Sequence, residues 1–144
     1  MFDIYICSSW SNRTRIRSFA ARIRNTTNFS VFDFTDMNDR KERVMPPEVV
    51  SHSATSYDDF LQQFQHTVRE NSEVIRACKL VLLFLPCGID AHADWAYGVG
   101  LGKLSLVIGY PKNGDYLATH LWANAIVEDT TQAIDWLKEL EIVS

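Results

Sequence analysis

The chain has 144 residues, a formal net charge of −4, and 47% hydrophobic and 22% charged residues. This length and balance predict one domain over residues 1–144 with a sizeable core of its own. The acidic charge argues against polymeric nucleic acid as a partner, since such proteins usually carry a basic footprint. No apolar run approaches the roughly 20 residues of a membrane span, and the N-terminus lacks the features of a secretory signal. We therefore expect a cytoplasmic protein without a membrane partner.

The first half of the chain alternates short apolar runs with one helical pattern. Residues 2–7 and 28–34 are predicted strands, and apolar side chains recur at helical spacing over 14–24. Residues 35–57 form an irregular polar segment with two adjacent prolines. Loops of that length inside a compact domain tend to be functional. We therefore expect 35–57 to be a mobile lid over a pocket.

The second half continues the alternation and indicates the fold class. An amphipathic helix is expected over 58–77, further helices over 91–100 and 131–140, and strands over 80–85, 104–108 and 125–127. Asp129 or Thr130 is the expected cap of the last helix. The order predicts an α/β, Rossmann-like or flavodoxin-like domain, with an about five-stranded parallel sheet and helices on both faces. We expect the strand order 2-1-3-4-5, with the unbroken apolar run 80–85 in the centre.

In such sheets, ligands bind at the carboxyl ends of the strands, between the first and third strands. Ser8, Ser9 and Trp10 follow the first strand and lead into a helix, so they are candidate substrate-binding residues. Hydroxyls and backbone N–H groups at a helix N-terminus suit a phosphate, and Arg13 adds positive charge. Trp10 has two interpretations, a base-stacking residue or a half-buried aromatic. Tyr5, in the first strand itself, is expected in the core.

The segment 87–103, CGIDAHADWAYGVGLGK, holds the main candidate residues. A turn at Gly88 leads into a helix of small residues, and glycine inside a helix costs about 1 kcal/mol relative to alanine. That cost requires close packing or room for a ligand. Asp94 lies near the helix start, where the dipole favours a carboxylate; it is either a functional acid or a surface acid. Asp90 is a helix cap or a ligand contact, and His92 a surface residue or a ligand contact.

This pattern of apolar strand, glycine turn, acid, small-residue helix and Gly-Lys resembles the nucleoside 2-deoxyribosyltransferase-like N-glycosidases. It is closest to the small bacterial and phage type, with its C-G-x-x-A-H-x-E signature, and the resemblance covers nearly the whole chain except 35–57. In that family the motif glutamate attacks the anomeric carbon of the sugar. Nine residues before Lys103, the equivalent position holds Asp94, which is one methylene shorter. The resemblance implies that Asp94 is the nucleophile, with an accessory acid at Glu70 or alternatively Glu73.

The resemblance further implies cleavage of the N-glycosidic bond, or deoxyribosyl transfer, on a nucleoside or nucleoside 5′-monophosphate. It also implies a homodimer or larger homo-oligomer and no cofactor. No His/Cys cluster has zinc-ligand spacing, and the three cysteines are expected to be reduced. Two other functions stay open. One is a non-catalytic nucleotide-binding module of the same fold; the other is a TIR-like signalling domain that cleaves NAD or a nucleotide.

Overall fold

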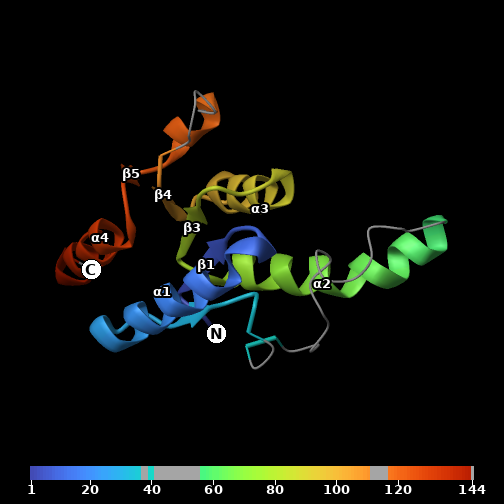
Figure 1. The fold of residues 1–144 in the computed structure, drawn as a ribbon, viewed down its shortest axis with the longest axis horizontal. Helices are drawn as coiled ribbons and strands as arrows, with labels where there is room; N and C mark the ends of the chain where they lie inside the picture. The colour runs from blue at the N-terminus through green and yellow to red at the C-terminus, as the bar shows by residue number, and fades with distance from the viewer. Residues whose placement is uncertain (37–38, 41–55, 111–116, 144) are drawn as a thin grey trace.

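The computed structural model describes residues 1–36, 39–40, 56–110 and 117–143. Figure 1 shows how the helices and strands of the chain are arranged. They are β1 (Ile4–Cys7), η1 (Trp10–Asn12), α1 (Arg13–Thr26), β2 (Val31–Phe32), α2 (Tyr57–Ala77), β3 (Leu80–Phe84), α3 (Ile89–Gly100), β4 (Leu104–Ile108), η2 (Ala118–Trp122), β5 (Ala125–Val127) and α4 (Thr130–Val143). The four expected helices and five expected strands are present. The second strand is shorter than expected, and the two short 3₁₀-helices, η1 and η2, were not predicted.

The five strands form one parallel sheet in the order β2-β1-β3-β4-β5. This confirms the predicted fold class and strand order. Every residue of β3 is buried, as expected for the central strand of a sheet covered on both faces. In the register of β1 and β3, Tyr5 lies beside Val81, a pairing that positions the site described below.

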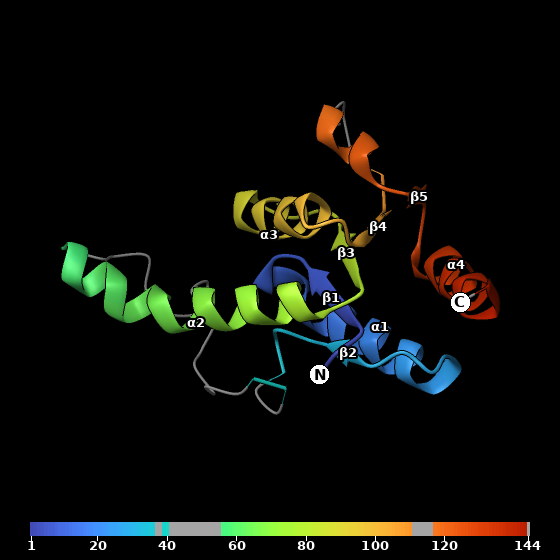
Figure 2. The same cartoon turned by 180° about the vertical axis from the view of Figure 1, so that it is seen from behind.

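The helices form two layers, one on each face of the sheet. Helix α1 packs with α4 on one face, and α2 packs with α3 on the other. In Figure 2 the N-terminal half of α2 extends well beyond the sheet. None of the helices in the described part of the chain combines the length and the apolar character needed to cross a membrane. At α4, Asp129 is the cap, because its carboxylate accepts a hydrogen bond from the backbone N–H of Gln132 at 2.9 Å.

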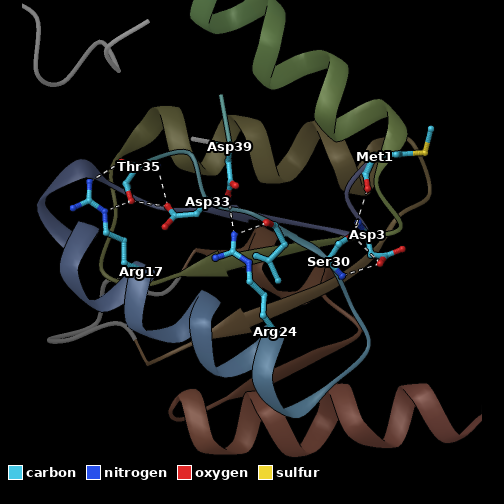
Figure 3. A network of polar contacts seen from close by, with 9 residues as sticks. Met1, Asp3, Arg17, Arg24, Ser30, Asp33, Thr35 and Asp39 are labelled. Carbon is cyan, nitrogen blue, oxygen red and sulfur yellow. Dashed lines mark hydrogen bonds and ion pairs between the residues drawn. The ribbon is translucent and has the colours of Figure 1, made fainter. Parts of the chain in front are cut away.

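A polar network holds the segment that follows β2 against α1 (Figure 3). The carboxylate of Asp33 accepts from both the backbone N–H and the hydroxyl of Thr35, and its burial raises the pKa of this acid. Arg17 donates to the hydroxyl and the carbonyl of Thr35. Arg24 forms an ion pair with Asp39 at 2.8 Å, and Asp39 accepts from the backbone N–H of Asp33. The network therefore holds Asp33, Thr35 and Asp39 against α1.

Candidate active site

A cavity of about 260 Å³ opens beside Asp94 on the face of the sheet covered by α2 and α3. Its size is just below the range of typical small-molecule pockets, about 300–1,000 Å³. Four parts of the chain line it: β1 and its end, the segment after β2, the middle of α2, and the start of α3. The lining residues are Tyr5, Cys7, Ser8, Phe34, Arg40, Phe60, Phe64, Thr67, Val68, Asn71, Asp90, Ala91, Ala93 and Asp94.

Tyr5 links Asp94 to the sheet. Its ring is 1% exposed, and its hydroxyl donates a hydrogen bond to Oδ2 of Asp94 at 3.2 Å. Burial, together with the charge of Asp94, holds the pKa of Tyr5 well above its usual value. The phenol is therefore protonated at neutral pH and stays a donor. The ring of Tyr5 does lie in the core, as expected, but its hydroxyl belongs to the site.

The start of α3 brings two carboxylates to the cavity. The cap of α3 is Gly88, so the interpretation of Asp90 as the helix cap is wrong; Asp90 lies in the first turn. Asp90 and Asp94 are four residues apart and therefore share one face of the helix, and both line the cavity. The positive end of the helix dipole stabilises the negative charge of Asp90, whereas Asp94 lies in the second turn, beyond most of this effect.

Glycine at position 98 explains how closely α3 approaches the sheet. A Cβ atom at Gly98 would lie 2.9 Å from Cγ2 of Val81 and closer still to Cγ1. A Cβ atom at Gly100 would meet nothing within 4 Å. Close packing on the sheet is thus the reason for Gly98, but not for Gly100. Because Gly98 lies one turn after Asp94, the close approach also brings Asp94 toward β1.

Arg40 forms part of the cavity wall between the segment after β2 and α2. Its side chain is fully buried and donates to the carbonyl of Phe34 at 3.1 Å and to Oδ1 of Asn71 at 3.5 Å. Its Nε lies 3.6 Å from Oε1 of Glu70. Glu70 is itself buried but does not line the cavity; it contacts the wall through Arg40. Glu73 is exposed.

Of the predicted lid, residues 35–57, the structure describes only residues 35–36, 39–40 and 56–57. The prediction that this segment is a mobile lid therefore falls mostly outside the described residues.

Thr67 is one of two polar residues, with Asn71, in the α2 wall of the cavity. It is 2% exposed and lines the cavity. Among the described residues, its hydroxyl has no hydrogen-bond partner. Sequence periodicity places Thr67 on the inner face of an amphipathic helix, but it does not reveal that the hydroxyl is unpaired.

The loop after β1 makes mostly internal contacts. The hydroxyl of Ser8 donates to the backbone carbonyl at the end of β3 at 2.8 Å, and Ser9 accepts from the backbone N–H of Gly88 at 2.9 Å. Trp10 is half-buried, with the Arg13 guanidinium 5.6 Å from its ring centroid. Of the residues expected on the phosphate side, only Ser8 lines the Asp94 cavity.

His92 pairs with His120 of η2 and does not line the cavity. Nδ1 of His92 lies 2.8 Å from the carbonyl of Gly88, which can only accept, so this nitrogen carries the proton. Nδ1 of His120 accepts from the backbone N–H of Leu117 at 3.4 Å. The two Nε2 atoms are 2.9 Å apart. His120 therefore donates to His92, and both rings are neutral in this arrangement.

The cysteines show no feature of a nucleophile. All three are free thiols, and Cys7 and Cys78 are buried. Cys87 lies 3.6 Å from Nδ1 of His92, but that nitrogen is a donor to Gly88. Burial raises the pKa of the Cys87 thiol to about 12, so the thiol is not ionised at neutral pH. Within the described ranges, no group of three or more His, Cys, Asp or Glu side chains could hold a metal ion.

Comparisons with known proteins do not identify a function, so the function is inferred from the cavity alone. No protein-family model matches the chain, and no curated protein is similar to it in sequence.

Proposed function

We propose that the chain cleaves the N-glycosidic bond of a nucleoside, by hydrolysis or by deoxyribosyl transfer, with the Asp94 carboxylate facing the anomeric carbon. One observation carries the proposal. A half-buried carboxylate at the wall of a small cavity is oriented by a buried tyrosine hydroxyl, at 3.2 Å. Cleavage of a glycosidic bond passes through an oxocarbenium-like state, which a carboxylate at the anomeric carbon stabilises or traps.

The reaction would follow the course of a retaining glycosidase. An oxygen of Asp94 forms a bond to the anomeric carbon as the bond to the base nitrogen breaks. The base leaves with the bonding electron pair and takes a proton from water. Water, or the nitrogen of a second base, then displaces the carboxylate and regenerates Asp94. Tyr5 fixes the orientation of the carboxylate, and positioning of this kind matters because a misplacement of about 1 Å can cost on the order of 100-fold in rate.

The charges that line the cavity favour a nucleoside over a nucleoside 5′-monophosphate. Among the described lining residues, Arg40 is the only cation, and Glu70 already forms an ion pair with it. Asp90 and Asp94 are both acidic. Two carboxylates favour the positive charge of an oxocarbenium-like sugar and oppose a phosphate dianion. A nucleotide substrate and a homo-oligomer are implied by the resemblance alone and rest on no contact of the described residues.

The test is a substrate panel of ribonucleosides, deoxyribonucleosides, their 5′-monophosphates and NAD, with released base measured by chromatography. We expect base release from at least one nucleoside. Asp94→Asn, which keeps the shape and removes the charge, should abolish release while the chain still folds. Asp135→Asn, an exposed acid on α4, is the matched control and should leave release unchanged. Equal release by wild type and Asp94→Asn would remove Asp94 from the mechanism. Intact ligands throughout would favour the binding-module alternative.

A further inference from the structure

The hydroxyl of Thr67 is a buried polar group that the described fold leaves without a partner. Burying a hydroxyl without a hydrogen bond costs free energy, so such groups are uncommon in native proteins and require an explanation. The contrast with Thr35 is informative, since Thr35 is also buried. Its hydroxyl donates to Asp33 at 2.6 Å and accepts from Nε of Arg17 at 3.2 Å. The same fold satisfies one buried threonine hydroxyl twice and leaves the hydroxyl of the other, a residue of the cavity wall, without a partner among the described residues.

The surroundings of Thr67 suit a flat heterocycle. Phe60 and Phe64 line the same wall, with ring centroids 5.1 Å apart, and Asn71 follows Thr67 by one helical turn. Arg40 can only donate, so the oxygen of the Asn71 amide faces Arg40. Asn71 thus contributes an NH₂ donor whose partner is not among the described residues. The α2 wall is therefore aromatic with a few hydrogen-bonding groups, whereas the α3 wall is acidic.

We propose that the hydroxyl of Thr67 hydrogen-bonds the heterocyclic base of the bound nucleoside and is a specificity-determining residue of the site. This inference rests on the proposed function. The sugar must lie against Asp94, so the base extends toward the aromatic α2 wall. A hydroxyl both donates and accepts, so it can pair with a ring nitrogen, a carbonyl or an exocyclic amine. Thr67 gains its missing partner only when a base is bound.

This assignment predicts that removing the Thr67 hydroxyl weakens base binding without lowering the melting temperature of the free protein. Thr67→Val keeps the shape of the side chain and removes the hydroxyl. The free chain loses no hydrogen bond among its described groups, so its melting temperature should stay the same or rise. The affinity for the preferred base should fall about tenfold, because one of its polar groups is left unpaired. Thr67→Ser keeps the hydroxyl and should retain most of that affinity.

The experiment uses the free bases adenine, hypoxanthine, cytosine and uracil as probes, with affinities measured by ligand-observed NMR titration. Free bases are chosen because their binding does not require cleavage. Thr35→Val is the stability control, and it should lower the melting temperature because it leaves the Asp33 carboxylate without its hydroxyl donor. Thr14→Val, an exposed residue of α1 outside the Asp94 cavity, is the matched control for binding and should change neither quantity.

The outcomes separate this inference from the proposed function. Weaker base binding by Thr67→Val at an unchanged or higher melting temperature supports the role of Thr67, whether or not nucleosides are cleaved. Three results would overturn it: equal base affinity in Thr67→Val and wild type, a loss of melting temperature like that of Thr35→Val, or no binding of any of the four bases to the wild-type chain. Base release from a nucleoside with unaltered selectivity in Thr67→Val would leave the Asp94 proposal standing and refute this one.

Discussion

Gly98 and Gly100 form a natural pair for testing how α3 is seated on the sheet. Both lie in the last turn of the same helix, and only Gly98 faces a neighbour. The perturbation is the single methyl group added by Gly98→Ala, compared with the same change at Gly100. Replacing glycine by alanine in a helix contributes about 1 kcal/mol of stability where space allows. Gly100→Ala should therefore stabilise the chain by up to about that amount.

At Gly98 the same methyl group would collide with Val81. Its distances to both Cγ atoms are 2.9 Å or less, whereas carbon atoms pack at about 3.5–4.0 Å. Val81 is β-branched, so its rotamer is stiff, and it is buried in the central strand. The helix must therefore lift by about 1 Å at this point. Overpacking of this kind costs about 1–3 kcal/mol, which the gain in helix propensity only partly offsets.

The assay is chemical denaturation of wild type and both variants, read by far-ultraviolet circular dichroism. We expect Gly98→Ala to unfold at lower denaturant than wild type, and Gly100→Ala at equal or higher denaturant. Gly98→Ala should cost less stability in the Val81→Ala background than in the wild type, since the two Cγ atoms it would meet are then absent. If Gly98→Ala proved as stable as Gly100→Ala, the close seating of α3 on β3 would be refuted.

Two further changes test the groups around the site. Tyr5→Phe removes the donor to Asp94, and since a hydrogen bond to a charged group contributes about 1.5–3 kcal/mol, turnover in the nucleoside assay should fall at least about tenfold; unchanged turnover would show that the bond is not needed. Burial, and then the nearby His92, lower the pKa of His120 from 6.5. Below that pH the unfolded chain binds a proton that the folded chain excludes, so the free energy of unfolding should fall as the pH drops below 6.5. His120→Gln should show a flatter dependence in denaturant titrations above and below this pH; the same slope in both proteins would contradict the assignment.

The sheet and the position of Asp94 could be predicted from the sequence because both follow from local patterns. The unbroken apolar run Leu80–Phe84 is typical of a strand covered on both faces. Alternating strands and helices then imply a parallel sheet, and the switch-point rule places the start of the next helix at its carboxyl edge. Asp94 lies in that helix. None of these steps requires knowledge of a contact between distant residues.

The rest of the site depends on such contacts. Tyr5 and Asp94 are 89 residues apart. The apolar pattern of β1 predicts that Tyr5 is buried, but it does not identify the partner of the Tyr5 hydroxyl. Arg40 lies in a polar, irregular segment, where a buried arginine has no local signature; Glu70 on α2 makes its burial possible. His120 lies in a short 3₁₀-helix, which lacks the periodicity of a longer helix.

The side-chain length at position 94 and the seating of α3 are two parts of one geometric arrangement. Val81 and Tyr5 are neighbours across β3 and β1, and Gly98 contacts the first while Asp94 contacts the second. Asp94 therefore reaches Tyr5 because the helix lies close to the sheet.

In this setting Asp94→Glu, longer by one bond of about 1.5 Å, should disturb the contact with Tyr5 and lower turnover. In the Gly98→Ala background the helix is lifted, so the longer acid should recover turnover lost by Gly98→Ala alone. Measuring base release for the two single variants and the double variant tests this coupling. Additive losses would mean that the seating of α3 and the reach of residue 94 are independent, whereas a faster single variant Asp94→Glu would mean that aspartate is too short for the site.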